Sequence, residues 1–556
     1  MTTNMLPAHE VRQREIVRKA AVRAFELPEL PSGLWFHGDI RDNFYYASYL
    51  FAAAADHEMD LPFDRGEAAA AAVRVLGEVL ALQNADPTAE LYGHWPLGLG
   101  PAPREARPSP LPAELMAGLM AYFAARYDAA LPAGLRAAFR DALTHAYRSR
   151  FYDKPLRDFN HHEAKYTALK LIFGRLFADE ALHADGRRSL KRTLAHVRER
   201  GMAEYGALPW FWHWVQAFTC ALALAGDDGG REDEEERADL RGLLDWLWHE
   251  RALYYLKGAW AAPHARALGH DLPKDGNVLF DYAQFGDFPL PDALPRTEYA
   301  GLLFYEAPEE ARRTALDRRK PAEVRKRIAR EYGGEEKMLH AYTYLTARFA
   351  AGGLLERCEE FDNEQHRWDV TLPLMASGSV NKAYFFHPGR GYAEGDPRHR
   401  SGHEQVLFHK NIVMALYDIP ETEDGRIVGV LPKGEWIAAG NALHALVNDV
   451  YLTVYLMQPF ALREERDRMT VVCAGRRHGA VVEAMSAEDA DCMGIDSVEA
   501  LAAGRKQRPP AFSDGETLRI DYVTRQGQPL RLEWTGANGT PASETAELKS
   551  KGGVWR

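Results

Sequence analysis

Three donor-capable side chains follow one another at Asn160, His161 and His162. An amide donates hydrogen bonds to a carboxylate, and an imidazole both donates hydrogen bonds and accepts protons near neutral pH. Several arginines, which bind carboxylates through two parallel hydrogen bonds, lie just before them. We expect this group to bind an anionic substrate. Helix capping by Asn160 is the structural alternative.

An aromatic segment begins about fifty residues later, after Tyr205. Aromatic rings stack on the apolar faces of sugars while polar groups fix the orientation of the ligand. Tryptophans two residues apart cannot share one helix face, so some of them belong to the core. We expect Trp210, His213 and Trp214 to contact a flat, hydroxyl-rich substrate, with Tyr205 projecting from the loop before the helix.

Two further motifs combine polar and aromatic side chains at the ends of helical patterns. Arg41 and Asp42 precede one such pattern, and His94 and Trp95 follow another. We expect all four residues to line the same substrate pocket. For Asp42, capping of the following helix is the structural alternative.

The densest cluster of histidine and arginine in the chain includes His399, Arg400, His403 and Gln405. His399 and His403 are four residues apart, but a proline and a glycine near them favour a loop, so helical metal-ligand spacing does not follow. We favour a loop that binds an anionic substrate or takes part in catalysis. A zinc site and a solvated loop are the alternatives, and we expect no metal and no cofactor.

Composition and missing motifs exclude several classes of function. The sequence has no GxxxxGK[ST], HExxH or GxSxG motif, which argues against P-loop nucleotide binding, zincins and serine hydrolases. A net charge of −12 argues against a nucleic-acid-binding surface. The polar start lacks a signal-peptide core and no apolar run is long enough to span a bilayer, so we expect a cytoplasmic protein without membrane contact.

The elements that must position these residues change in character along the chain. Apolar residues recur at three- and four-residue intervals from about residue 9 to about residue 260, which predicts helices joined by short loops, as in a bundle, a solenoid or a closed toroid. The predicted helices are 42–58, 65–84, 111–127, 132–150, 160–178, 187–200, 209–225 and 237–257. A charged helical pattern returns at 307–332.

From Tyr342 onward, short runs rich in β-branched and aromatic residues alternate with turn residues. The clearest runs are 342–349, 369–373, 426–431, 450–456, 469–473 and 518–523. This pattern is typical of an antiparallel sandwich. We therefore expect an α+β multidomain protein, with an N-terminal (α/α) toroid over residues 1–338 and an antiparallel β-sandwich over residues 339–556.

Taken together, the Asn160-His161 pair, the later aromatic stretch and the His-rich loop in a β-domain resemble the heparinase II/III-like and alginate-lyase group of polysaccharide lyases, which combine an α/α toroid with a β-sandwich. The resemblance implies β-elimination on an anionic oligosaccharide or polysaccharide without a cofactor. It implies that Asn160, beside His161, neutralises a uronate carboxylate and that Tyr205 or His403 removes the C5 proton. The family's tyrosine would fall near 210–214, where this sequence has Trp, Phe and His.

Two other classes stay open. A glycoside hydrolase on the same scaffold would need two carboxyl groups, for which Asp39, Asp42, Glu204 and Glu404 are the candidates. A non-catalytic carbohydrate-binding protein is the third possibility, since a fold does not fix a function. An unsaturated product would identify the lyase, and a reducing sugar without unsaturation the hydrolase. The sugar, its sulfation and the oligomeric state stay open as well.

Overall fold

The computed structural model describes residues 6–226, 230–265, 278–292, 294, 299–332, 335–356, 367–375, 378–388, 403–505 and 508–536. The chain forms two units, and each contains more than one stretch of sequence. The helical unit consists of Met1–Glu199, Pro209–His249 and Leu279–Pro308. The sheet unit consists of Arg200–Leu208, Glu250–Val278 and Glu309–Arg556.

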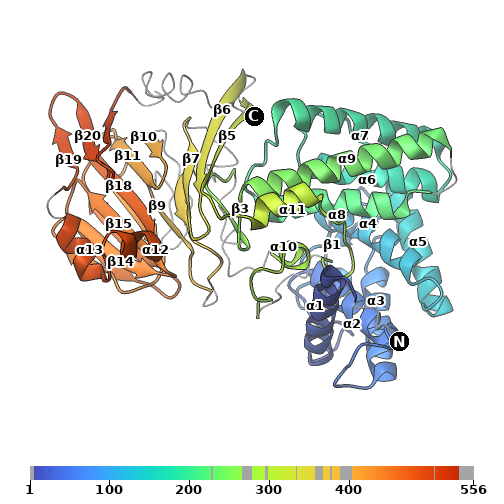
Figure 1. The fold of residues 1–556 in the computed structure, drawn as a ribbon. Coiled ribbons are helices and arrows are strands. Elements are labelled where there is room, and N and C mark those ends of the chain that lie inside the picture. The colour runs from blue at the N-terminus through green and yellow to red at the C-terminus, as the bar shows by residue number, and fades with distance from the viewer. Residues whose placement is uncertain are drawn as a thin grey trace. The chain divides into compact units, whose positions relative to one another are not determined.

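All eight predicted helices are present (Figure 1), and most lie within three residues of the expected ends, but α7 and α9 begin seven and six residues earlier than predicted. They are α2 (Ile40–Ala55), α3 (Arg65–Ala81), α4 (Pro110–Arg126), α5 (Ala133–Ser149), α6 (His161–Leu176), α7 (Glu180–Arg200), α8 (Leu208–Leu224) and α9 (Arg231–Leu253). Helices α1 (Ala8–Phe25) and α10 (Leu279–Gln284) complete the helical unit, and a short ribbon pairs β1 (Trp95–Pro96) with β2 (Pro108–Ser109). No helix in the described residues has the length and hydropathy that a membrane span requires.

Local sequence explains where these helices begin. The side chain of Asp39 caps α2 by accepting a hydrogen bond from the Arg41 backbone, and Asp64 caps α3 in the same way through Glu67. Helix α4 starts at Pro110, where a proline has no helical hydrogen bond to lose. Helix α4 packs against α5 and α6, which brings the N-terminal turn of α6 to a buried face of α4.

The sheet unit is an antiparallel sandwich. One sheet contains β5 (Ala322–Tyr332), β6 (Glu335–Leu345), β7 (Ala350–Leu354), β8 (Trp368–Thr371), β9 (Lys382–Phe386), β12 (Arg426–Leu431), β16 (Phe460–Glu464) and β17 (Met469–Ala474). The second contains β10 (Glu404–His409), β11 (Ile412–Asp418), β13 (Ile437–Ala439), β14 (Ala442–Val447), β15 (Val450–Leu456) and β18 (Arg477–Ser486). Buried residues of both sheets form one hydrophobic core between them.

A smaller antiparallel sheet of β19 (Ala511–Asp514), β20 (Leu518–Val523) and β21 (Pro529–Glu533) covers the outer face of the second sheet through its own hydrophobic cluster. Each of the six predicted β-runs contains a strand. The short helices α12 (Ala487–Cys492) and α13 (Val498–Arg505) follow β18. The chain is therefore an α+β protein that combines a helical unit with a unit of antiparallel sheets.

Two expectations about chain organisation need correction. The stretch 307–332 is helical only over α11 (Glu309–Leu316), because from Ala322 onward it pairs along its whole length with β6. The boundary expected at residue 338 consequently falls inside β6. The sheet unit also takes in a hairpin of β3 (Tyr255–Leu256) and β4 (Ala259–Trp260), which lies in the part of the sequence expected to be helical.

Candidate active site

The first turn of α6 is shaped by a capping interaction at Asn160. Its Oδ1 accepts hydrogen bonds from the backbone N–H groups of His162 (3.0 Å) and Glu163 (3.1 Å). The Glu163 carboxylate accepts the backbone N–H groups of the three residues before Asn160. The two side chains thus fix the start of the helix together, with Asn160 bound to the first turn and Glu163 to the residues that lead into it. Asn160 is therefore a helix cap, and its Nδ2 group is the part of the amide that the cap does not use.

The buried carboxylate of Glu114, on α4, contacts three side chains from the first two turns of α6. Glu114 accepts a hydrogen bond from Nδ1 of His162 (2.6 Å) and an ion-pair contact from Nζ of Lys165 (2.9 Å) through the same oxygen. Its other oxygen accepts the Tyr166 hydroxyl. Glu114, Lys165 and Tyr166 are 6%, 4% and 6% exposed. His162, with 34% of its side chain exposed, is the member of the cluster that a ligand can reach.

These contacts settle the charge states of the cluster. Burial acts to raise the pKa of Glu114, but the hydrogen bond from His162 and the charge of Lys165 outweigh it and hold that pKa far below its ordinary value. Burial, reinforced by the hydrogen bond to Glu114, raises the pKa of Tyr166. At neutral pH Glu114 is therefore ionised and Tyr166 keeps its proton.

The arrangement can perform general base catalysis. Because Nδ1 of His162 faces an ionised carboxylate, that nitrogen carries the proton and Nε2 is left as the acceptor. A carboxylate behind an imidazole fixes its tautomer and stabilises the imidazolium formed after proton transfer. Glu114 and His162 therefore form a carboxylate–histidine dyad, and Lys165 keeps the carboxylate charged.

Other predicted residues surround the dyad. The His161 ring centroid lies 4.0 Å from that of His162, 5.8 Å from that of Trp210 and 5.5 Å from that of His213. Trp210 and His213 are half-buried. Glu114, Lys165 and His213 also line a cavity of about 20 Å³, which is enough for one water molecule. The structure thus brings Asn160, both histidines and the start of α8 together in the helical unit.

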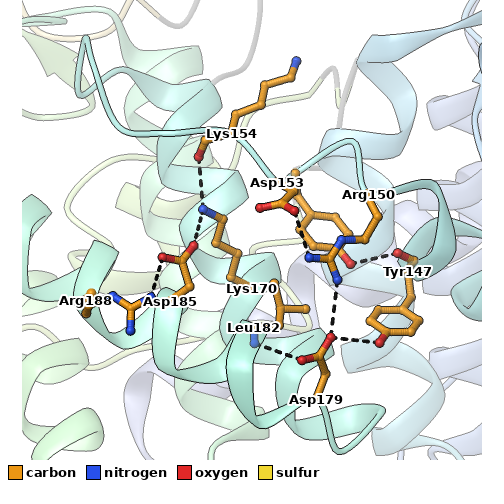
Figure 2. A network of polar contacts seen from close by, with 10 residues as sticks. Tyr147, Arg150, Asp153, Lys154, Lys170, Asp179, Leu182, Asp185 and Arg188 are labelled. Carbon is orange, nitrogen blue, oxygen red and sulfur yellow. Dashed lines mark hydrogen bonds and ion pairs between the residues drawn. The ribbon is translucent and has the colours of Figure 1, made fainter.

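The connection from α5 to α6 is fixed by a polar network (Figure 2). Lys170, a buried residue of α6, donates to the Lys154 carbonyl oxygen (3.0 Å) and pairs with Asp185 of α7 (2.7 Å). Arg150 bonds Asp153 within the connection and Asp179 at the start of α7. The loop that leads to Asn160 is therefore held at several points by α6 and α7.

Three side chains that were predicted to contact substrate are buried in the core. Trp95 is 0% exposed and donates from Nε1 to the Val79 carbonyl oxygen, and Trp214 is 1% exposed. Gln405 is also 0% exposed. Its side-chain amide donates a hydrogen bond to the Glu533 carbonyl oxygen and accepts one from the Thr535 backbone N–H. An aromatic or amide side chain next to polar sequence suits a pocket and a core equally, so sequence alone did not separate the two.

The N-terminal motifs have structural partners. Arg41 pairs with Asp39 (2.6 Å), and Asp39 rather than Asp42 caps α2. His94 is 5% exposed, with Nδ1 2.9 Å from the Tyr92 carbonyl oxygen, and its ring lies 5.2 Å from that of Phe151. Substrate contact by Arg41, Asp42 and His94 stays a prediction.

The two predicted bases lie in the sheet unit. Tyr205 is 3% exposed and belongs to a hydrophobic cluster with Ile328 and Leu339, so it does not project from its loop as expected. His403 is half-buried just before β10. Their role as the base stays a prediction. His399 and Arg400 lie outside the described residues, and their contact with substrate stays a prediction.

The carboxylates considered for a hydrolase are largely engaged. Asp39 caps α2 and pairs with Arg41. Glu404 is 7% exposed and accepts hydrogen bonds from Trp368 Nε1 (2.7 Å) and the Tyr417 hydroxyl (2.7 Å). Glu204 is 1% exposed. In the described residues no group of three His, Cys, Asp or Glu side chains is placed to hold a metal ion.

Sequence reasoning missed Glu114, Lys165 and Tyr166. The signal was present in α4, where Glu114 is the one charged residue before Arg126 in an otherwise apolar helix. A lone charge on a buried helix needs a partner, which points to a polar cluster. The partner could not be named, because the contact joins residues 48 apart in the chain.

No family model and no curated protein matches this sequence. Among solved structures, the chain is similar to a chondroitin AC lyase of Streptomyces coelicolor A3 in complex with chondroitin sulphate, with a TM-score of 0.43, 11% identity, and coverage of 92% of this chain and 83% of the enzyme. A chondroitinase AC lyase studied as oligosaccharide complexes gives a TM-score of 0.40 at 9% identity, covering 93% and 88%. At such TM-scores no residue-level equivalence follows, so function has to be argued from the side chains.

Proposed function

We propose that the chain is a polysaccharide or oligosaccharide lyase that cleaves uronic-acid-containing glycans by β-elimination. The observation that carries this proposal is the Glu114–His162 dyad, whose histidine follows the capping amide of Asn160 by two residues. A β-elimination needs a base at one carbon and a donor for the adjacent carboxylate, and these residues supply both. Within the class, we propose the heparinase II/III-like or alginate-lyase-like subtype on the Asn160-His161 pair.

In the proposed reaction, Nδ2 of Asn160 donates to the uronate carboxylate and stabilises the charge that develops on it. Nε2 of His162 takes the C5 proton. The electrons of the C5–H bond form the C4–C5 double bond, the bond from C4 to the leaving oxygen breaks, and that oxygen takes a proton from water. Glu114 stabilises the resulting imidazolium, and Trp210 offers a half-buried ring to the sugar.

This proposal differs from the sequence-based expectation in the identity of the base. Tyr205 and His403 stay alternatives, and His162 comes first because it is both exposed and held by a carboxylate. A hydrolase is less well supported. It needs two carboxyl groups that act on the glycosidic bond, whereas Glu114 and Glu404 are buried and hydrogen-bonded.

The experiment separates the cap from the chemistry at Asn160. Asn160→Asp keeps an oxygen for the cap but replaces the donor by a charge that repels a uronate, whereas Asn160→Ala loses both functions. We expect Asn160→Asp and His162→Gln to keep the wild-type melting temperature and to lower turnover by roughly two to three orders of magnitude. Formation of the unsaturated product, followed by its ultraviolet absorbance on a panel of uronic-acid glycans, is the measurement.

His57→Gln is the matched control, because His57 is an exposed histidine of the same unit, and it should retain full activity. Tyr205→Phe and His403→Gln test the alternative bases, and loss of turnover confined to one of them would move the base there. Reducing ends without unsaturation in the wild type would contradict the lyase and favour a hydrolase. Binding without any cleavage would favour a carbohydrate-binding protein.

A further inference from the structure

Lys154 has a fixed backbone and an exposed side chain. Its backbone N–H donates to the Tyr152 carbonyl oxygen (2.9 Å), and its own carbonyl oxygen accepts from Lys170, which is 4% exposed and paired with Asp185. Figure 2 shows the Lys154 side chain directed away from this anchor. A lysine whose main chain is held on both sides loses less freedom when its ammonium group binds a ligand.

The ammonium group lies beside the dyad. It stands 5.1 Å from the centroid of the Tyr166 ring, and Tyr166 shares the Glu114 carboxylate with His162. Tyr166 and His162 are four residues apart on α6, which is about one helical turn. Lys154 therefore places a positive charge roughly one turn along α6 from the imidazole that we propose as the base.

The nearby acidic groups are committed to other cations. Asp153 pairs with Arg150 (2.8 Å), and Asp185 pairs with Lys170 and with Arg188 (3.0 Å). Within the described part of the chain, Lys154 itself makes no ion pair. An exposed ammonium group without a counter-charge, next to a site with polar and aromatic side chains, is suited to an anionic group of a ligand.

We propose that Lys154 binds a carboxylate or sulfate group of the substrate, on the sugar adjacent to the one that loses its proton. This inference rests on the proposed function. The carboxylate of the reacting sugar is attached to the carbon that gives up the proton, so it belongs within reach of His162 and Asn160. A charge one helical turn away reaches the neighbouring sugar instead, so Lys154 selects polyanionic chains and contributes to affinity rather than to the chemical step.

The test compares Lys154→Met with Lys191→Met, an exposed lysine of α7 that is 57% exposed and pairs with Glu235. The probes are sulfated and desulfated chondroitin oligosaccharides of equal length, with affinity measured by titration calorimetry and KM and kcat by ultraviolet absorbance. Lys154→Met should weaken binding and raise KM about tenfold, with kcat within about twofold and an unchanged melting temperature. Its affinity should also depend less on salt.

An equal loss with both probes identifies a carboxylate as the bound group, and a loss confined to the sulfated probe identifies a sulfate; either supports the proposal. Unchanged affinity in Lys154→Met, an equal loss in Lys191→Met, or a lower kcat at unchanged KM would overturn it. Binding by the wild type without unsaturated product overturns the proposed function alone, because the calorimetric comparison still decides the role of Lys154. A wild type that binds neither probe overturns the role of Lys154 in binding these chains, and the panel of uronic-acid glycans then decides the proposed function.

Discussion

Glu114 shows how a buried charge can be tolerated at the scale of single residues. Removing a carboxylate from water is costly unless opposite charge and hydrogen bonds replace the solvent. Glu114 has three such partners, and one of them, Lys165, is itself buried. The two ions are therefore interdependent, because each loses a buried opposite charge when the other is removed. Such an arrangement serves to position His162 more than to stabilise the fold.

A prediction follows for Glu114→Gln. The amide keeps the shape of the side chain but takes the Glu114 charge away from the buried Lys165 ammonium group, which should lower the free energy of unfolding by about 3 kcal/mol. Turnover should fall as well, because the imidazolium of His162 loses its carboxylate. Urea unfolding followed by circular dichroism measures the first effect, and the ultraviolet assay measures the second.

The double variant Glu114→Gln/Lys165→Met separates stability from catalysis. It removes the buried ammonium group together with its Glu114 counter-charge, so it should recover most of the lost stability while turnover stays low. Equal stability of Glu114→Gln and the wild type would show that Lys165 finds another partner. Recovery of turnover in the double variant would show that Glu114 acts only through the fold.

The sequence indicated part of this site and not the rest, for physical reasons. Asn160 could be recognised because capping is local: the residues that it contacts follow it directly. Glu114 could not be paired with His162, because their contact depends on how α4 packs against α6. The burial of Trp95 and Trp214 could not be foreseen, because a tryptophan contributes as much to a core as to a sugar-binding surface.

At the scale of elements, helices were predictable from apolar spacing, as in α3 and α6, whereas the start of α2 was placed two residues late because Asp39 and not Asp42 caps it. Strand β5 could not be predicted, because its charged sequence favours a helix. Its strand conformation depends on pairing with β6 over its full length. Pairing of this kind is set by the neighbouring strand rather than by local preference. The β-runs within the sandwich core contain enough β-branched residues to be recognised without knowledge of their pairing partners.

The strands of the sandwich bury two histidines that should make its stability depend on pH. His387, after β9, faces the Arg426 carbonyl oxygen with Nδ1 (2.9 Å), and His478 of β18 faces the Gly475 carbonyl oxygen with Nε2 (2.7 Å). In the described residues their other ring nitrogens are buried without a hydrogen-bond partner. Burial lowers the pKa of both side chains. The charge of His403 lowers the pKa of His387 further, and the charge of His387 does the same for His478.

The sign follows from proton uptake. A folded state with a lowered histidine pKa binds fewer protons than the unfolded chain below about pH 6.5, so stability is lost as pH falls through that value. We expect the melting temperature of the sheet unit to drop between about pH 7.5 and about pH 5.5. His478→Gln keeps a donor for Gly475 and does not titrate, so it should reduce the slope, and His57→Gln should not. Identical slopes in all three proteins would contradict the assignment.

At the scale of the whole molecule, the chain does not pass once from helices to sheets. Residues 200–208 and 250–278 belong to the sheet unit although helical-unit segments flank them in sequence. Tyr205 belongs to the hydrophobic cluster that contains Ile328 and Leu339, and its carbonyl oxygen accepts the Ala265 backbone N–H (2.7 Å). A domain boundary drawn from composition alone overlooks these two segments, because each is short and has no distinct sequence pattern.

The 250–278 segment also completes a buried ionic network in the sheet unit. Lys382 of β9 is 4% exposed and pairs with Asp369 of β8 (2.8 Å), which is 0% exposed. Its remaining partners are the Trp260 carbonyl oxygen (3.2 Å) and Nε2 of His264 (3.1 Å), both from the 250–278 segment. Without that segment, a charged pair in the sandwich loses two of the groups that replace water around it.

The last prediction concerns a fragment of residues 309–556, which contains every strand from β5 to β21. We expect it not to reproduce the thermal transition of the sheet unit, because Lys382 loses Trp260 and His264 and the cluster around Ile328 loses Tyr205. In the intact chain, His264→Ala should destabilise the sheet unit, whereas His57→Ala should not. Calorimetry of the fragment and of the two variants is the measurement. A fragment that melts cooperatively at the temperature of the intact sheet unit would contradict this prediction. It would show that residues 200–208 and 250–278 add nothing to the stability of the sandwich.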